Sequence, residues 1–389
     1  MEARTARDLT VRVHALVQAK RTELAASSLR VPIAYYRDRA LFEWERDELL
    51  RRTPLVAAPS AQVPRPGDYH VRELLGTSVL ITRDGDGRAH VLQNYCSHRG
   101  ARVADGSGSA ARFVCRYHHW TYGCDGALLG RPRAACFDDL PDGERGLLAL
   151  PAEERHGLIW CVLAPEARID VATHLGTLAA ELEAWGYGGC TYLDHREIQL
   201  PANWKAGLEN FADFYHVPYV HQSSEAAHVG DCAAFDRFGR HHRLLSGMGS
   251  LTQLSAEEAA RVRDDAHLVV AYWVYPNLVL THQAATIDLV QFLPGAAPGA
   301  CTMRHTCLAR RPSLGVVERE HYRAVFEAIT AVFTGEDAAA LERAGDGLAH
   351  SAREHLLIGR NEPGVQNIVR TLQAAGRGRA ARSGTGSGT

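Results

Sequence analysis

The sequence lacks the features that mark membrane-spanning, secreted and nucleic-acid-binding proteins. Its longest apolar run, residues 268–280, is interrupted by Pro276 and Asn277 and is too short to cross a bilayer. Residues 1–20 contain no apolar core, so we expect no signal peptide. The formal net charge of -2 gives no reason to expect nucleic acid or a membrane surface as a partner. The nine cysteines show no paired spacing, which argues against a disulfide scaffold and favours a cytoplasmic protein.

Two motifs for redox chemistry are also missing. No Gly-x-Gly-x-x-Gly follows a predicted strand, so the dinucleotide fingerprint is absent. The Cys-x4-Cys-x2-Cys run of plant-type ferredoxins is absent as well. The chain therefore has neither a recognisable NAD(P)H site nor a reductase of its own. Lysine is confined to Lys20 and Lys205, which we interpret as a compositional bias toward arginine.

What is present indicates a folded chain of at least two domains. The 389 residues are 46% hydrophobic and 23% charged, which is typical of globular proteins. Apolar spacing predicts helices over residues 1–28 and 39–52. After Pro54 the pattern changes to short strands with a turn at residues 84–87, and it stays β-rich to about Leu163. The strands are expected at residues 69–75, 78–82 and 89–94.

The second half of the chain mixes strands and helices. Residues 222–262 are polar and glycine-rich, so we expect loops there. Strands are expected within residues 268–293 and 300–310, and helices over residues 316–333 and 335–349. We expect the acids at the start of the last helix to lie at its N-terminus.

Two short cysteine–histidine pairs stand out in the β-rich segment. Cys96 and His98 form Cys-x-His, and Cys115 and His118 form Cys-x2-His. Each pair is expected on a loop between strands, where two loop tips together bind one metal centre. Two thiolates and two imidazoles hold either zinc or a [2Fe–2S] cluster with both histidines on one iron. The spacing predicts metal binding without deciding between these two.

A second set of metal-binding side chains lies in the stretch ENFADFYHVPYVH. Asp213, His216 and His221 form Asp-x2-His-x4-His. If the chain is helical from about Trp204, Asp213 and His216 share one face, and a bend at Pro218 returns His221 toward it. Two imidazoles with a carboxylate from elsewhere are what a 2-His-1-carboxylate iron(II) site needs. An ordinary buried helix with two hydrogen-bonded histidines is the alternative.

Both motifs resemble those of the Rieske non-haem iron, aromatic-ring-hydroxylating oxygenases. NYCSHRGARV (94–103) and CRYHHWTYGCDG (115–126) are similar to the family's Rieske motif, which reads Cys-x-His-Arg, a gap, then Cys-x2-His-x-Trp. NWKAGLENFADFYHVPYVH (203–221) resembles the mononuclear iron motif of the large (alpha) subunit. The resemblance covers roughly residues 30–375. One departure is His119, which stands where the family usually has glycine and would put a third imidazole beside the cluster.

The resemblance implies an α+β architecture. An all-β Rieske [2Fe–2S] domain, residues 55–165, would precede a mixed α/β, helix-grip-like catalytic domain with a large antiparallel sheet, residues 166–375. Residues 1–54 would be N-terminal helices that pack on the catalytic domain. Residues 376–389, rich in Gly, Ser and Arg, are expected to be disordered.

The resemblance also implies residue roles. Cys96, His98, Cys115 and His118 would hold the [2Fe–2S] cluster. His216 and His221 would hold the mononuclear Fe(II), with Asp337 on a later helix as the third ligand and Glu336 as the alternative. Asp213 would be a catalytic residue that joins His216 to His118 of a neighbouring chain, which requires a ring of chains, most simply a homotrimer.

The implied activity is that of a terminal oxygenase. It would use O2, and electrons that reach it from NAD(P)H through a separate ferredoxin or flavin reductase, to mono- or dihydroxylate or oxidatively demethylate a small organic substrate, which we expect to be aromatic or heterocyclic. Asn210 and Phe214 are candidate substrate contacts, and the motif looks like that of the monooxygenase and demethylase branch. The alternative is a zinc- or Fe–S-binding redox or interaction protein without oxygenase activity. Neither a nucleic acid nor a membrane is expected as a partner.

Overall fold

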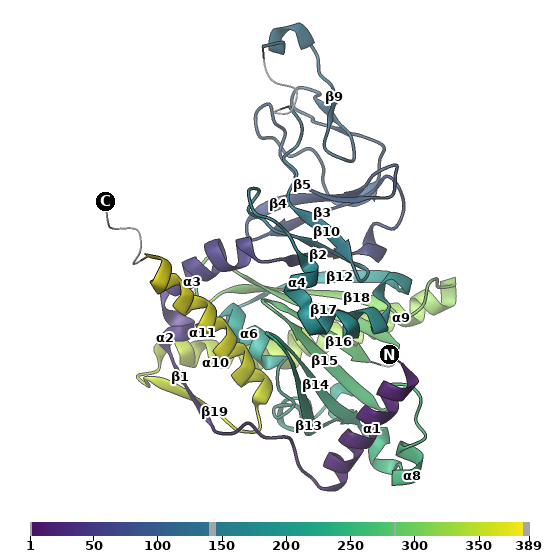
Figure 1. Ribbon diagram of the computed structural model, residues 1–389, viewed down its shortest axis with the longest axis vertical. Helices are drawn as coiled ribbons and strands as arrows, with labels where there is room; N and C mark the ends of the chain where they lie inside the picture. The colour runs from purple at the N-terminus through teal and green to yellow at the C-terminus, as the bar shows by residue number, and fades with distance from the viewer. Residues whose placement is uncertain (1, 140–144, 284, 384–389) are drawn as a thin grey trace. The chain divides into compact units, whose positions relative to one another are not determined.

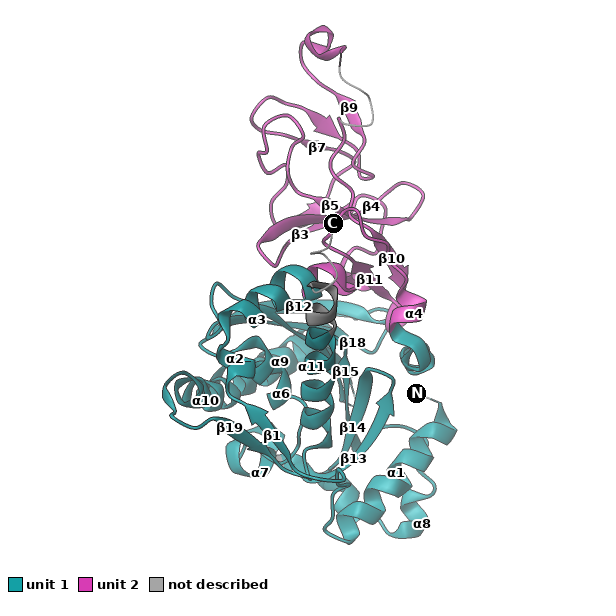
Figure 2. Ribbon diagram, turned by 60° about the vertical axis from the view of Figure 1, so that its left-hand side comes forward, with its two compact units in different colours: residues 1–49, 175–185, 190–389 teal, residues 50–174, 186–189 magenta. Residues whose placement is uncertain are grey.

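Two units of different construction make up the chain. The computed structural model describes residues 2–139, 145–283 and 285–383. The larger unit consists of residues 1–49, 175–185 and 190–389, and the smaller unit of residues 50–174 and 186–189 (Figure 2). Each unit is described by itself below, with the element labels of Figure 1.

The smaller unit is built from three antiparallel sheets of short strands. One sheet has the order β5-β4-β3-β6, the second β7-β8-β9 and the third β10-β11-β2. The strands predicted near residues 69, 78 and 89 are confirmed as β3, β4 and β5. The bounds are β2 Leu55–Pro59, β3 Asp68–Leu74, β4 Thr77–Arg83, β5 Ala89–Gln93, β6 Ser107–Ser109, β7 Phe113–Val114, β8 Thr121–Tyr122, β9 Leu128–Gly130, β10 Ala152–Arg155 and β11 Leu158–Cys161, followed by helix α4 Val171–Leu175.

The larger unit is organised around a seven-stranded antiparallel sheet. Strands β13 to β18 each pair with the next in sequence, and β12 closes the order beside β18. The bounds are β12 Thr191–Leu200, β13 Val229–Phe238, β14 His241–Met248, β15 Leu268–Val274, β16 Leu278–Gln283, β17 Thr286–Pro294 and β18 Cys301–Ala309. Every residue of β15 and β17 is buried, which requires cover on both faces of the sheet.

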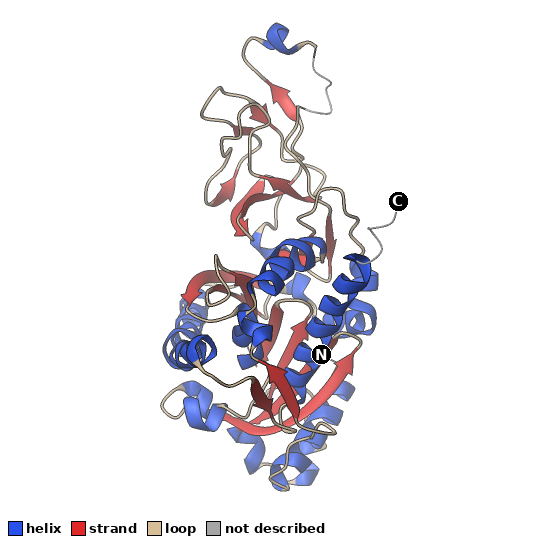
Figure 3. Ribbon diagram, turned by 90° about the vertical axis from the view of Figure 1, so that its left-hand side faces the viewer, coloured by secondary structure: helices blue, strands red, loops and turns tan. Residues whose placement is uncertain are grey.

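Helices supply that cover (blue around the red strands in Figure 3). On one face, Gly207 of α6 lies against Phe292 of β17, so closely that an added Cβ would come within 2.6 Å of the ring. On the other face, Trp185 of α5 stacks on His282 of β16 with ring centroids 3.7 Å apart. The helices are α1 Ala3–Gln18, α2 Ala34–Arg37, α3 Arg39–Trp44, α5 Ala179–Trp185, α6 Trp204–Asn210, α7 Val217–Val220, α8 Ala256–Ala259, α9 Val316–Val332, α10 Ala338–His350 and α11 Pro363–Ser383, and the small sheet β1-β19 joins Leu29–Pro32 to His355–Ile358.

The structure confirms the predicted α+β fold class and corrects several predicted elements. Helix α1 ends at Gln18 rather than near residue 28, and Lys20 follows with a left-handed φ of 49°. The predicted helix of residues 39–52 is α3 continued by a π-helical segment, η1 Glu45–Leu50. At the other end, α11 runs through residue 376 to Ser383, so the disorder expected from residue 376 is wrong up to that point. Residues 384–389 lie outside the described residues.

The loops expected over residues 222–262 are largely two long strands, β13 and β14. Strand β14 reads HHRLLSGM and is buried along most of its length, so no alternation of polar and apolar residues announces it. Its polar side chains find partners only in the folded chain. Arg243 donates to Glu181 Oε2 at 2.6 Å and to Asp236 Oδ2 at 2.8 Å, and His242 Nδ1 lies 3.1 Å from Asn367 Nδ2.

Candidate metal centres

The two cysteine–histidine pairs lie on two loops of the smaller unit that close in the same way. The N–H of Cys96 donates to Ala101 O at 2.8 Å, and the N–H of Cys115 donates to Trp120 O at 2.8 Å. In each loop the fourth residue after the cysteine has a left-handed backbone, with φ 73° at Gly100 and φ 57° at His119. The usual glycine of the family at the second position is therefore explained, because only glycine adopts this conformation without strain.

Aromatic packing brings the two loops together around their histidines. The ring of His98 stacks on Trp120 with centroids 5.0 Å apart, and it meets the ring of His118 edge-on at 4.5 Å. Both thiols, Cys96 and Cys115, are buried. The hydroxyl of Tyr122 lies 3.0 Å from Cys96 Sγ, and burial raises the pKa of this tyrosine.

These residues fit a [2Fe–2S] cluster. Nδ1 of His98 is buried and has no hydrogen-bond partner within the described residues, so a ring nitrogen is left free for a metal. The four ligand atoms do not form a group within 4.8 Å of one another, unlike the three described in the next paragraphs. A single zinc ion with bonds of about 2.0–2.3 Å would need such a tight group. A wider cradle suits a centre of two irons.

The second motif is not one helix with a bend at its proline. Helix α6 ends at Asn210, and α7 begins only at Val217. Asp213 and His216 lie in the break between them, and Pro218 sits in the first turn of α7, where a missing N–H costs nothing. Asp213 closes this segment, because its Oδ1 accepts from the backbone N–H of His216 at 2.9 Å.

Three side chains of this unit converge as a metal site would require. One ligand atom each from His216, His221 and Asp337 lies within 4.8 Å of the other two. Asp337 Oδ1 is 3.7 Å from His216 Nε2 and 3.4 Å from His221 Nε2. Two imidazoles and one carboxylate are the donor set of a facial triad, which suits iron(II) and leaves positions open for other ligands. These residues fit a mononuclear non-haem iron.

The remaining nitrogen of each histidine is held by its own carboxylate. His216 Nδ1 lies 3.0 Å from Asp213 Oδ1, and His221 Nδ1 lies 2.7 Å from Glu336 Oε2. Such contacts orient the rings and leave each Nε2 toward Asp337. Burial alone would lower the pKa of His221, but hydrogen bonds from Asp337 and Glu336 raise it above its ordinary value. The His221 hydrogen bond in turn lowers the pKa of Glu336.

A π-helical turn places the two neighbouring acids on different partners. Segment η9, Phe333–Asp337, joins α9 and α10 into one continuous helical run, so the acids do not open a separate helix as predicted. Glu336 turns to His221 and to the hydroxyls of Ser223 and Ser224, at 3.1 and 2.8 Å. Asp337 is buried and accepts from Asn210 Nδ2 at 2.8 Å. The resemblance favoured Asp337 over Glu336 as the third ligand, while the residues alone left both acids open.

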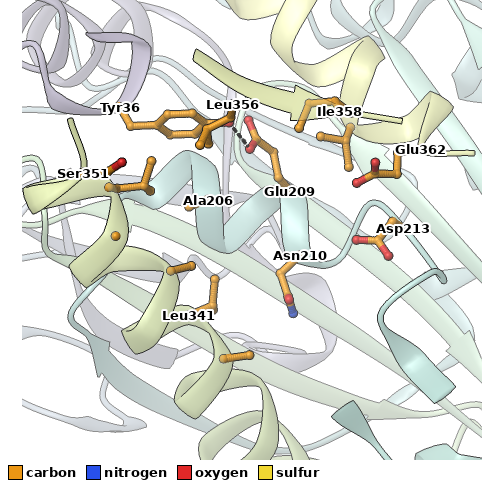
Figure 4. Close-up of a pocket in the computed structure, with 15 residues that line it drawn as sticks. Tyr36, Ala206, Glu209, Asn210, Asp213, Leu341, Ser351, Leu356, Ile358 and Glu362 are labelled. Atoms are coloured by element: carbon orange, nitrogen blue, oxygen red, sulfur yellow. Dashed lines mark hydrogen bonds between the residues drawn. The ribbon is translucent and has the colours of Figure 1, made fainter. Parts of the chain in front are cut away.

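The predicted substrate contacts lie close to this centre but are already engaged. Asn210 donates to Asp337, and Phe214 is buried. Phe211 packs on Phe292 and Phe333, with centroids 5.6 and 4.9 Å apart. A cavity of about 490 Å³ lies beside α6, and Asn210 and Asp213 both line it (Figure 4).

Comparisons with known proteins agree with this arrangement. The family "Ring hydroxylating alpha subunit (catalytic domain)" matches residues 182–376, and "Rieske [2Fe-2S] domain" matches residues 53–143. The chain belongs to the ring-hydroxylating oxygenase alpha subunits of the Rieske type. Its cofactors are accordingly a Rieske [2Fe–2S] cluster and a mononuclear iron. Within the described part of the chain, no helix combines the length and apolarity needed to span a membrane.

The matches to individual relatives extend over only part of each relative's length. The chain is 34% identical over 196 residues to "Choline monooxygenase, chloroplastic" of Spinacia oleracea, which is 49% of this chain and 45% of that protein. It is 32% identical over 238 residues to "N,N-dimethyl phenylurea N-demethylase subunit alpha" of Sphingobium sp. (strain YBL2), 58% of this chain and 52% of that one. The chain thus spans about half the length of the curated relatives it matches.

Solved structures share the fold over nearly the whole chain. The quaternary ammonium Rieske monooxygenase CntA superposes with a TM-score of 0.76 at 20% identity, over 91% of this chain and 96% of that one. Naphthalene 1,2-dioxygenase from Rhodococcus sp. superposes with a TM-score of 0.73 at 19% identity, over 95% and 98%. At these identities the likeness establishes the fold, not the substrate.

Proposed function

We propose that this protein is the terminal oxygenase of a Rieske system, which hydroxylates or oxidatively demethylates a small organic substrate with O2. The observation that carries the proposal is the convergence of His216, His221 and Asp337 in the same chain as the two cysteine–histidine loops. An electron carrier or a zinc module has no use for the second site. When bound, the iron supplies the activation of dioxygen and the cluster supplies the electrons.

The chain's own residues then hold and orient these groups. Cys96, His98, Cys115 and His118 hold the cluster. Nε2 of His216, Nε2 of His221 and a carboxylate oxygen of Asp337 hold the iron. Glu336 accepts the Nδ1–H of His221 and keeps that ring in place, and Asn210 does the same for Asp337 through its amide.

Asp213 has a second task in this proposal. Its Oδ1 accepts from His216, and its other oxygen would accept from His118 of a neighbouring chain, which links the two redox centres. That role requires a ring of chains, so we propose a homotrimer. Electrons come from NAD(P)H through a separate ferredoxin or flavin reductase. None of the nine cysteines forms a disulfide, which suits a reducing compartment, and we propose a cytoplasmic location.

We further propose that the substrate carries an N-methyl group. Choline monooxygenase and the phenylurea N-demethylase are named for such compounds, and so is the "Glycine betaine monooxygenase oxygenase subunit" of Pseudomonas aeruginosa, which is 32% identical over 192 residues. The motif of residues 203–221 favours the same branch. Monooxygenation at an N-methyl carbon leads to loss of formaldehyde, while attack on a longer chain leaves a hydroxyl.

Metal analysis of anaerobically purified protein, together with its visible spectrum, tests the class of protein. The proposal expects about three irons per chain and a Rieske-type spectrum. Zinc without colour would contradict it and favour a zinc-binding interaction protein. A panel of choline, glycine betaine and N,N-dimethyl phenylurea, supplied with a ferredoxin, its reductase and NADH, then tests the substrate class through O2 uptake and formaldehyde release.

A further inference from the structure

The cavity beside α6 carries chemistry that the metal ligands do not use. Its volume is about 490 Å³, and its walls come from α2, α6, α10, β19 and α11 of the larger unit. Most lining side chains are apolar, but one end gathers three acids, Glu209, Asp213 and Glu362 (Figure 4). Tyr36 donates to Glu209 Oε2 at 2.7 Å across the cavity wall. Three carboxyl groups on a mainly apolar cavity require an explanation.

Glu209 is the innermost of these acids. The residue is 8% exposed and its Oε1 is buried, and the hydroxyls of Tyr36 and Tyr35 beside the carboxyl group lower its pKa less than burial raises it. Burial raises the pKa of Glu209 to about 8, so the carboxyl group holds a proton at neutral pH. A buried acid that lines a cavity and carries a proton is suited to store that proton and pass it on.

The charged groups around Glu209 do not offset the effect of burial on its pKa. Lys205, one turn earlier on α6, donates to Glu45 Oε1 at 2.6 Å and to the backbone oxygen of Tyr35, so it is committed elsewhere. Lys205 lowers the pKa of Glu209 less than burial raises it, and Glu362 raises it further. The titratable groups that face Glu209 are Tyr35 and Tyr36 from α2, Lys205 from α6 itself and Glu362 ahead of α11.

Glu362 forms the outer end of the same cavity. Its side chain is partly exposed, and its Oε2 accepts from the backbone N–H of Gly359. Burial raises the pKa of Glu362 above its ordinary value, and so does the neighbouring charge of Asp213. An acid in contact with solvent can thus exchange protons at one end of a cavity whose other wall holds a protonated acid.

The cavity also reaches the iron site through two of its lining side chains, because Asp213 contacts His216 and Asn210 contacts Asp337. Asn210 follows Glu209 on α6, lines the cavity and donates to Asp337 Oδ1 at 2.8 Å. The reaction proposed above needs protons there. Monooxygenation balances as RH + O2 + 2 H⁺ + 2 e⁻ giving ROH + H2O, and the electrons reach the iron without bringing those protons.

We propose that this cavity is the proton inlet of the oxygenase, with Glu362 taking protons from solvent and the carboxyl group of Glu209 holding them one residue before Asn210. The inference rests on the proposed function, because a protein that reduces no oxygen needs no inlet. The O–H bond of one carboxyl group breaks as the next acceptor along the cavity gains the proton. Each acid is then reprotonated from solvent, so no other reactant is required.

Glu209→Gln and Glu362→Gln test the inlet in the intact holoprotein. Glutamine keeps the shape of the protonated acid but neither takes up nor releases a proton. Glu342→Gln is the matched control, since Glu342 lies on the exposed side of α10, a helix that also lines the cavity. Each protein is reduced with dithionite and mixed with O2 and the panel compound that supports turnover, choline being the first probe. Reoxidation of the cluster is followed by its visible absorbance in H2O and D2O.

We expect the wild type and Glu342→Gln to reoxidise rapidly and to slow as pH rises above about 8, where Glu209 loses its proton. Both cavity variants should be slower by a factor of about 10² or more, with unchanged iron and cluster contents, and the pH limb should disappear in Glu209→Gln, which removes the titrating group. Cavity variants that match the wild type in rate, pH profile and solvent isotope effect would overturn the inlet. A wild type that binds no mononuclear iron or never reoxidises would overturn the proposed function itself.

Discussion

The two metal-binding regions differ in how much of the chain each needs. The cluster ligands occupy two loops, Cys96–His98 and Cys115–His118, and each loop closes on itself through a backbone hydrogen bond five residues long in span. The iron ligands come from distant segments, since even His221 and its partner Glu336 lie 115 residues apart. The first region is formed by two short loops whose aromatic rings pack on each other. The second exists only once α6, α7 and η9 have met.

That difference determines how each region should fail. A local site with buried thiols contributes its metal energy to the fold of its own unit. A dispersed site depends on the positions of helices that the sheet already fixes, so its loss should leave the unit folded. The following experiments test this contrast, in order of decreasing expected effect.

The largest effect is expected from Cys115→Ser. A hydroxyl is a poor replacement for a thiolate on iron, so the visible spectrum should disappear and the smaller unit should lose stability. Absorbance and thermal unfolding measure both. Cys124→Ser is the control, because Cys124 lies nearby but its thiol donates to Ala110 O instead. A Cys115→Ser protein with its full spectrum would contradict the ligand assignment.

The next largest difference is expected between substitutions of the two neighbouring acids of η9, Glu336 and Asp337. Asp337→Ala should lose the mononuclear iron while the spectrum of the cluster and the melting temperature stay near those of the wild type. Glu336→Gln should keep the iron but bind it about 10- to 100-fold more weakly, because it only orients His221. Iron titration after chelation measures both variants. The opposite order of effects would mean that Glu336 is the ligand.

Asp213→Ala should interrupt electron transfer between the two metal-binding regions while both keep their metals. It removes a partner of His216 but no ligand, so much of the iron and all of the cluster should stay bound. Reduced cluster should then persist in the presence of O2 and substrate. Mixing Cys96→Ser with His216→Ala chains should restore some turnover, because electrons cross between subunits in the proposed trimer. Rapid reoxidation in Asp213→Ala would refute the bridge.

The buried acid should make the larger unit sensitive to pH. The folded-state pKa of Glu209 is about 8, against an ordinary value of 4.5. The contribution of protonated Glu209 to the free energy of unfolding is therefore fully present below pH 4.5 and is lost as pH rises through 8. The free energy of unfolding of the wild type should fall by on the order of 5 kcal/mol relative to Glu209→Gln over this window. Urea unfolding of both proteins at the two ends measures the difference, and parallel pH profiles would contradict it.

The smallest effect should come from the matched positions of the two cluster loops. The left-handed φ of 57° at His119 strains a residue that has a Cβ, so His119→Gly should stabilise the smaller unit by about 0.5–1 kcal/mol. Gly100→Ala should do the reverse by a similar amount, since φ is 73° there and no atom lies within 4 Å of the added Cβ. Thermal loss of cluster absorbance measures both. If both variants lose their cluster absorbance at the same temperature as the wild type, the left-handed backbone does not carry the expected cost at these two positions.

Much of this could be predicted from the sequence because the relevant spacings are short. The cluster loops, the Asp-x2-His-x4-His motif, the β3–β5 hairpins and the strands after residue 268 all reveal themselves within a few residues. Strands β13 and β14 did not, because His242 and Arg243 are polar yet buried, and their partners Asn367, Glu181 and Asp236 come from other elements. The end of α1 and the helical continuation of α11 were also misjudged by local composition.

By itself, the sequence determined the family, the order of its two metal motifs and the α+β fold, because side-chain chemistry and local spacing are written along the chain. The sequence favoured Asp337 only through the family resemblance, and the tertiary structure gives the physical reason, since a π-helical turn directs Glu336 to Nδ1 of His221 and Asp337 to the Nε2 atoms. Tertiary structure alone decided that Glu209 is a buried, proton-holding acid, because that property depends on which groups fold around the carboxyl group and which do not.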